Sequence, residues 1–145
     1  MERAASYRAA MARQGLPADT QLLPAEAEPD AAIRAMLAGW SPPEAVLAAN
    51  SLLLMGALRA ARRAGLVVPQ DLALAGFDNE PWTELVEPGL TVIEQPLAEI
   101  GRVAMALLFD RLRTPAAPAR RVMLSGRCIL RGSTAPRGQR GALFG

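Results

Sequence analysis

Two polar side chains follow apolar runs that have the length of buried strands. Asn50 comes directly after residues 45–49, and Asp78 comes shortly after residues 72–76. The carboxyl ends of parallel strands meet at one edge of a sheet, so we expect Asn50 and Asp78 to lie together. An Asn amide and an Asp carboxylate can bind neighbouring hydroxyls of a sugar or the edge of a purine. Two simpler readings stay open, Asn50 as a helix cap and Asp78 as a turn residue.

Further candidates lie close to these two positions in the predicted elements. Phe77 precedes Asp78 and is either a wall of the pocket or a core residue. Arg3 falls in the first turn of a predicted helix, where a cation gains nothing from the helix dipole. It therefore has a specific partner or is an ordinary solvated Arg. The single cysteine, Cys128, has no neighbouring His or Lys to activate it and is predicted to be an inert, buried strand residue.

The chain lacks two residue types on which much enzyme chemistry depends. All sixteen of its basic residues are Arg, and it contains no Lys and no His. The absence of Lys excludes a Walker phosphate loop, and the absence of His excludes Ser-His-Asp catalysis and the usual zinc sites. Carboxylate pairs such as Glu80 and Glu84 are not focused on one site. We therefore expect a binding protein that is not an enzyme and carries no metal or cofactor.

Apolar periodicity and turn residues predict alternating helices and strands. Helices are predicted at residues 2–14, 30–38, 52–64 and 97–112, with a helical turn at 82–85. Strands are predicted at 20–23, 45–49, 72–76 and 91–95, with one or two late strands at 122–124 and 128–130. The strands at 45–49 and 72–76 are expected to be buried on both faces. Residues 132–145, including a tail at 135–145, are expected to be disordered. The pattern is typical of an α/β domain with a mainly parallel sheet flanked by helices.

Two predicted helices carry more apolar surface than one contact can bury. In the helix at 52–64 one side can cover the sheet, and the other is predicted to face a second subunit, with Gly56 allowing close approach. The predicted dimer residues of this helix are Leu53, Leu54, Ala57, Leu58 and Ala61. The helix at 97–112 also needs a surface to pack on, because one of its faces carries Ile100, Val103, Ala104, Leu107 and Leu108.

The net charge of +2 hides an uneven distribution along the chain. Residues 111–145 carry eight Arg and no acid, whereas residues 1–110 carry eight Arg against fourteen acids. A basic end can touch nucleic acid, although surface decoration by Arg is the simpler explanation. No apolar signal-peptide core follows Met1, and the longest apolar run, residues 52–58, is too short to span a bilayer. We expect a cytoplasmic protein without a membrane partner.

Several motifs in a fixed order resemble the effector-binding region of the lactose-repressor/galactose-repressor family of bacterial transcription regulators. They are PEAVLAAN at 43–50, MGALRA at 55–60, GLVVPQDL at 65–72, GFDN at 76–79, LTVIEQP at 90–96 and RGST at 131–134. The resemblance covers most of the chain. It implies a periplasmic-binding-protein-like fold of type I, in which two α/β lobes close on a small molecule.

The resemblance also assigns roles to particular residues. Arg3, Asn50 and Asp78 match the family's effector contacts in the second lobe, and Leu97 falls beside a position where some members have an aromatic pocket residue. The helix at 52–64 and the loop near Trp82 match the parts that form the homodimer. The effector implied is a sugar or a related polyol.

The family's helix-turn-helix and first lobe do not precede Met1 in this sequence. We therefore interpret residues 1–134 as a partial effector-binding domain, with the second lobe at 1–95 and 120–134. The helix at 97–112 would pack on the missing first lobe, and DNA would be bound only through the missing N-terminal domain. The alternatives are a sugar-binding solute receptor of a transporter, an α/β enzyme and a stand-alone dimerisation module.

Overall fold

A computed structural model describes residues 2–23 and 28–136 of the chain. Its centre is a four-stranded sheet in the order β1 (Ala45–Leu47), β2 (Ala73–Phe77), β3 (Thr91–Glu94) and β4 (Arg127–Ile129). The first three strands are parallel, and β4 pairs with β3 in the antiparallel direction. The mainly parallel α/β sheet predicted from the sequence is therefore confirmed.

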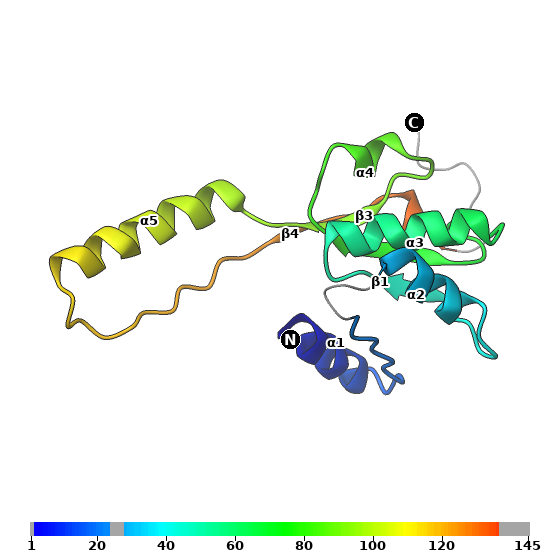
Figure 1. The fold of residues 1–145 in the computed structure, drawn as a ribbon, viewed down its shortest axis with the longest axis horizontal. Coiled ribbons are helices and arrows are strands. Elements are labelled where there is room, and N and C mark those ends of the chain that lie inside the picture. The colour runs from blue at the N-terminus through cyan, green and yellow to red at the C-terminus, as the bar shows by residue number, and fades with distance from the viewer. Residues whose placement is uncertain (1, 24–27, 137–145) are drawn as a thin grey trace.

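Two helices cover one face of this sheet in successive layers. The helix α3 (Ser51–Arg63) packs on β2, and α2 (Pro29–Leu37) packs on α3 (Figure 1). Gly56 permits this second contact, because a Cβ atom at Gly56 would lie 3.0 Å from the Cβ of Pro29. The close approach that the sequence assigned to a second subunit is thus made by α2 of the same chain. The fully buried side chains of the hydrophobic core include Leu54, Leu72, Leu74, Leu90 and Val92.

Local sequence explains where these helices begin and end. Asn50 caps α3, its side-chain oxygen accepting a hydrogen bond from the Leu53 amide at 2.8 Å. Gly65 ends α3 with a φ of +73°, a backbone region that favours glycine. Pro29 occupies the first turn of α2, where a missing amide hydrogen costs nothing.

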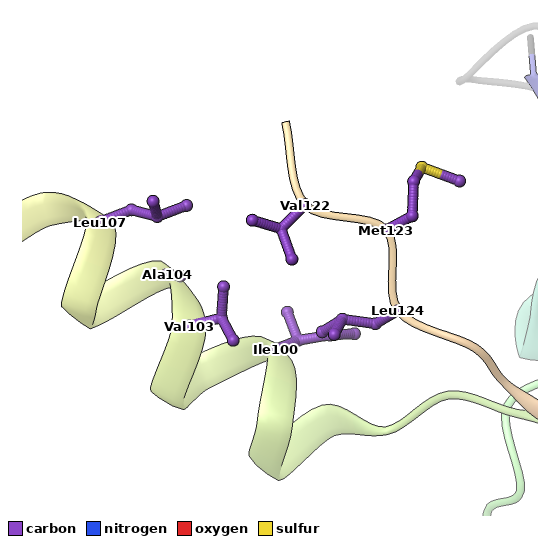
Figure 2. Close-up of a pocket in the computed structure, with 7 residues that line it drawn as sticks. All are labelled: Ile100, Val103, Ala104, Leu107, Val122, Met123 and Leu124. Atoms are coloured by element: carbon purple, nitrogen blue, oxygen red, sulfur yellow. The ribbon is translucent and has the colours of Figure 1, made fainter. Parts of the chain in front are cut away.

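An arm, defined here as residues 97–124, projects away from the sheet. It consists of α5 (Leu97–Arg113) and the extended segment that returns to β4 (Figure 1). No residue of α5 is buried. The inner side of the arm encloses a hollow of about 340 Å³ (Figure 2), lined by Ile100, Val103, Ala104, Leu107, Val122, Met123 and Leu124. The apolar face expected on this helix is present, and only the returning segment of the arm lies against it.

The remaining described helices are short or peripheral. The N-terminal α1 (Glu2–Arg13) has no buried residue and lies beside the sheet and the helices that cover it, residues 28–95 and 125–136, which we call the sheet domain. The helix α4 (Trp82–Leu85) follows β2. A 3-10 helix, η1 (Gly132–Thr134), is the last helix of the described residues and contains the fully buried Ser133. The expectation that residues 132–134 are disordered was therefore wrong. Residues 137–145 lie outside the described residues.

Several strand predictions also need correction. Residues 20–23 and 122–124 are not strands, since neither segment finds a hydrogen-bonding strand beside it. The strand β1 is at the edge of the sheet, and its Ala45 and Leu47 are exposed instead of buried. Cys128 is exposed as well, because β4 forms the other edge. A single sequence does not show which strands lie at the edges of a sheet.

Candidate functional site

The carboxyl ends of β1 and β2 bring Asn50 and Asp78 to one edge of the sheet. The two strands are parallel neighbours, and the Ala48 amide donates to the carbonyl of Ala75 at 2.8 Å. The chain then turns to Asn50 on one strand and to Asp78 on the other. This is the edge at which open parallel sheets bind ligands, where loops and helix N-termini present polar groups.

Asn50 is exposed, and its two side-chain atoms have separate environments. The Oδ1 atom is occupied as the cap of α3, as described above. The Nδ2 atom makes no hydrogen bond to any residue in the described part of the chain, which leaves two N–H donors facing outward. The cap and an outward-facing donor therefore coexist in one side chain.

Arg3 joins the site from α1. Its guanidinium lies 4.0 Å from the centroid of the Phe77 ring, a cation–π contact, and donates a hydrogen bond to the carbonyl of Ala49. Arg3 is thus held between the residues that precede Asn50 and Asp78. Phe77 is half-buried and supports Arg3, so it forms a wall of this edge and not a part of the buried core.

Asp78 has an unusual backbone conformation. Its φ is +75°, which is uncommon for residues other than Gly and is most often tolerated by Asn and Asp. The Asp78 amide donates to the carbonyl of Ile93 at 3.0 Å, and its carboxylate accepts a hydrogen bond from the Gln95 side chain. Both partners belong to β3 or to the residue just beyond it.

Four further polar residues form what we call the strand-end network: Asn79, Glu94, Arg127 and Arg131. Asn79 donates to Glu94 Oε1 at 2.9 Å and accepts from Arg131 Nη2 at 2.8 Å. Glu94 also accepts from Arg127 Nη2 at 2.9 Å. The hydrogen bonds from Asn79 and Arg127 hold the pKa of the Glu94 carboxyl below its ordinary value, so Glu94 is ionised at neutral pH.

Sequence reasoning missed Gln95 and the strand-end network. The only signal for Asn79 and Gln95 is that both fall at strand ends, beside residues already chosen. The partners of Arg127 and Arg131 are distant in sequence, since 52 positions separate Arg131 from Asn79. Pairing over such a separation becomes visible only when the strand order is known.

Leu97 is not brought into this site. It is the first residue of α5 and is 70% exposed, with its side chain at the base of the arm. Its match to a pocket position therefore stays a prediction about a closed, two-lobed form.

The predicted dimer residues divide into two groups. Leu54, Ala57 and Ala61 are fully buried and Leu58 is 5% exposed, all within the chain's own core. They have no surface left for a second chain, because α2 and the sheet enclose them. Leu53 and Trp82 are half-buried, and the indole of Trp82 donates to Glu80 Oε2 at 3.0 Å. A dimer role for these two residues stays a prediction.

Other site types find no support among the described residues. Within residues 2–23 and 28–136 there is no group of three or more Cys, Asp or Glu side chains that could hold a metal ion. No helix in this part of the chain is long and apolar enough to cross a membrane.

Comparison with known proteins places this arrangement in a family. A family model described as periplasmic binding protein-like domain matches residues 1–134. The HTH-type transcriptional repressor CytR of Escherichia coli K12 is 43% identical over 93 residues, which cover 64% of this chain and 27% of that repressor. The HTH-type transcriptional regulator MalR of Streptomyces coelicolor is 36% identical over 98 residues, 67% of this chain and 28% of that regulator. The matched region is thus about a quarter of each relative.

Solved structures share the fold over a greater length. A LacI-family regulator structure from Sanguibacter keddieii superposes with a TM-score of 0.80 and 33% identity, covering 92% of this chain and 53% of that one. A complex of the transcriptional regulator CelR with cellobiose gives a TM-score of 0.78 and 31% identity, covering 91% and 42% of the two chains.

The mainly parallel sheet carries polar residues at the carboxyl ends of its strands. Together with the family match over residues 1–134, this sheet defines a periplasmic-binding-protein-like domain. The chain belongs to this family. Within the family it corresponds to the effector-binding region of the lactose-repressor/galactose-repressor regulators.

Proposed function

We propose that this chain senses a small hydroxyl-rich effector for a DNA-binding transcription regulator. The observation that carries the proposal is the position of Arg3, Asn50 and Asp78 at one edge of the sheet. Arg3 and Asn50 present N–H donors, and the Asp78 carboxylate accepts hydrogen bonds. Donors and a carboxylate at the same edge suit vicinal hydroxyls, which both donate and accept.

Relatives support a sugar or a related polyol as the effector. Regulator structures similar to this chain hold cellobiose and, in a protein from Enterococcus faecium, ribose. The latter is 33% identical, with a TM-score of 0.72, and the alignment covers 89% of this chain and 49% of that one. The curated relatives are regulators, which favours this role over the solute receptor of a transporter and over an enzyme.

The proposed mechanism uses the division into a sheet domain and an arm. Residues 1–95 and 120–134 supply the second lobe, and α5 packs on a first lobe that lies outside these 145 residues. Effector bound between the lobes favours one closure state, and a homodimer passes this preference to DNA-binding heads in the cytoplasm. Such coupling between sites is typically about 1–3 kcal/mol.

A titration with free sugars tests the proposal. D-Ribose and cellobiose are titrated at millimolar concentrations into the isotope-labelled chain, and amide shifts are followed by NMR. We expect weak binding, because one lobe supplies only part of the contacts, with the largest shifts at residues 49–51 and 77–79. Asp78→Asn should weaken binding about tenfold or more, because it removes a charged acceptor. The matched control, Asp19→Asn, changes an exposed carboxylate outside the site.

Two results would count against the proposal. One is equal binding by wild type and Asp78→Asn. The other is a set of shifts confined to surfaces away from the carboxyl ends of β1 and β2. Nanomolar affinity of the chain alone would contradict the idea that part of the cleft is supplied by a first lobe.

A further inference from the structure

The conformation of Asp78 requires an explanation in terms of its neighbours. An Asp with a φ of +75° keeps that conformation only where surrounding contacts hold it. The backbone contact is the hydrogen bond from the Asp78 amide to the Ile93 carbonyl at 3.0 Å, and the side-chain contact is with Gln95. Both contacts attach Asp78 to the end of β3.

Asn79 provides the second attachment, one residue further on. Its amide group bridges Glu94, to which it donates, and Arg131, from which it accepts. Arg131 is firmly placed, with its side chain 16% exposed and its Nη1 donating to the Leu90 carbonyl at 2.8 Å. Asn79 cannot rotate without breaking these two hydrogen bonds and a third, longer one of 3.4 Å that its Oδ1 accepts from Thr83 Oγ1. Because it follows Asp78 directly, it restricts the backbone of Asp78.

Glu94 connects Asn79 to the residues at the base of the arm. Glu94 is the last residue of β3 and Arg127 is the first of β4, and the two are paired in the strand register. Beyond these residues the chain leaves the sheet for the arm and returns from it, as Figure 1 shows. We call residues 95–96 and 125–127 the arm root.

We propose that the strand-end network holds Asp78 in position at the carboxyl ends of β1 and β2, where the effector is proposed to bind. The same network links these strand ends to both sides of the arm root. The inference rests on the proposed function, since it assigns Asp78 to effector binding. Asn79, Glu94, Arg127 and Arg131 act through Asp78 and need no contact with a ligand. A shift of the Asp78 backbone on binding is thereby transmitted through Asn79 and Glu94 to the arm root.

The test uses two measurements that need no ligand. The first is hydrogen exchange at the Asp78 amide, compared with core amides of β2 such as Leu74. The second uses Cys128, the chain's single cysteine, which is exposed on β4 beside Arg127. A trifluoromethyl tag on its thiol reports on the arm root by fluorine NMR.

Asn79→Ala disconnects the network at its centre. We expect the Asp78 amide to exchange about tenfold faster, with the Leu74 amide unchanged, and the Cys128 tag to shift or broaden. Glu94→Gln keeps an acceptor for Asn79 but removes the charge that pairs with Arg127. It should shift the Cys128 tag while leaving Asp78 exchange within about twofold of wild type. Asn79→Asp, which keeps the acceptor for Arg131 and loses donation to Glu94, is a second variant if Asn79→Ala does not fold.

The control variant is Arg63→Ala, which breaks the ion pair with Asp30 between α2 and α3 and should change neither measurement. The proposal is overturned if Asn79→Ala leaves Asp78 exchange at the wild-type rate. It is also overturned if all sheet amides accelerate together, because that result indicates a purely structural role. Since no ligand is present, these results decide the role of the network separately from the question of whether a sugar binds.

Discussion

Asn50 combines a structural and a proposed functional role in one side chain, and the two can be separated. Its Oδ1 atom caps α3, and its Nδ2 atom faces outward. Asn50→Ser keeps an oxygen for the cap and removes the outward N–H donors. We expect Asn50→Ser to leave the free energy of unfolding nearly unchanged and to weaken ribose binding. Asn50→Ala should also destabilise the fold by about 1 kcal/mol through loss of the cap.

Urea denaturation and sugar titration of both Asn50 variants provide the check. Equal destabilisation by Ser and Ala would show that the cap depends on the amide itself. Unchanged ribose binding in both would remove Asn50 from the effector site.

Glu94 makes the strand-end network sensitive to acid. Its pKa is lowered first by the hydrogen bond from Asn79 and then by Arg127. A carboxyl whose folded pKa lies below its unfolded value stabilises the fold above the unfolded value, about 4.3. This contribution is lost as the pH falls through the folded value. We expect Arg127→Ala to raise the pKa of Glu94, as measured by carbon NMR of its side-chain carboxyl. An unchanged titration would mean that the ion pair does not persist in solution.

The candidate site could be predicted in part from the sequence. Asn50 and Asp78 were found because each follows an apolar run, which is a local signal. The place of Arg3 in the first turn of a helix left a specific partner and an ordinary solvated Arg both open. Its assignment to the site came through resemblance to a family, because its partners Ala49 and Phe77 are far away along the chain. The strand-end network has no local signal, since its members meet only after β3 and β4 have paired.

At the scale of the elements, Ser133 fastens η1 to the sheet. This fully buried residue accepts a hydrogen bond from the Thr91 amide at 2.8 Å and donates to the Leu74 carbonyl at 2.6 Å. Ser133→Ala leaves both buried backbone groups without this partner. The expected cost is about 1–3 kcal/mol in the free energy of unfolding, measured with urea. Ser125→Ala is the matched control, because Ser125 is exposed. An equal effect of the two variants would contradict the assigned role.

The limits of prediction at this scale have a physical cause. The helix α3 was located correctly because its cap at Asn50 and its end at Gly65 are local features. Its apolar excess was assigned to a second subunit, whereas α2 covers it. Periodicity shows how much apolar surface must be covered but does not identify the element that covers it. The exposure of β1 was missed for the same reason, since it depends on strand order.

At the scale of the whole molecule, the arm shares no buried hydrophobic core with the sheet domain. None of the residues of α5 is buried, and the apolar hollow of the arm is formed by the arm alone. Val103→Glu should reduce binding of a hydrophobic dye and any self-association. It should change the free energy of unfolding of the sheet domain by less than about 1 kcal/mol.

Dye fluorescence and sedimentation of the Val103→Glu variant test this expectation. Met105→Glu is the control, because Met105 is 50% exposed and does not line the hollow. Dye binding that is equally strong in wild type and Val103→Glu would show that the arm is covered in solution.

The register of β3 and β4 gives the arm a particular place in the architecture. Glu94 and Arg127 sit opposite each other on neighbouring antiparallel strands, so the chain leaves and re-enters the sheet at one point. None of the buried hydrophobic core residues lies between Glu94 and Arg127 in the sequence. A two-residue turn can join antiparallel neighbours, so the simplest connection here would be a β-hairpin. The arm is therefore a modular insertion at a hairpin tip. We expect changes in its length or sequence to leave the packing of the sheet's core intact, because the arm contributes no buried core residue.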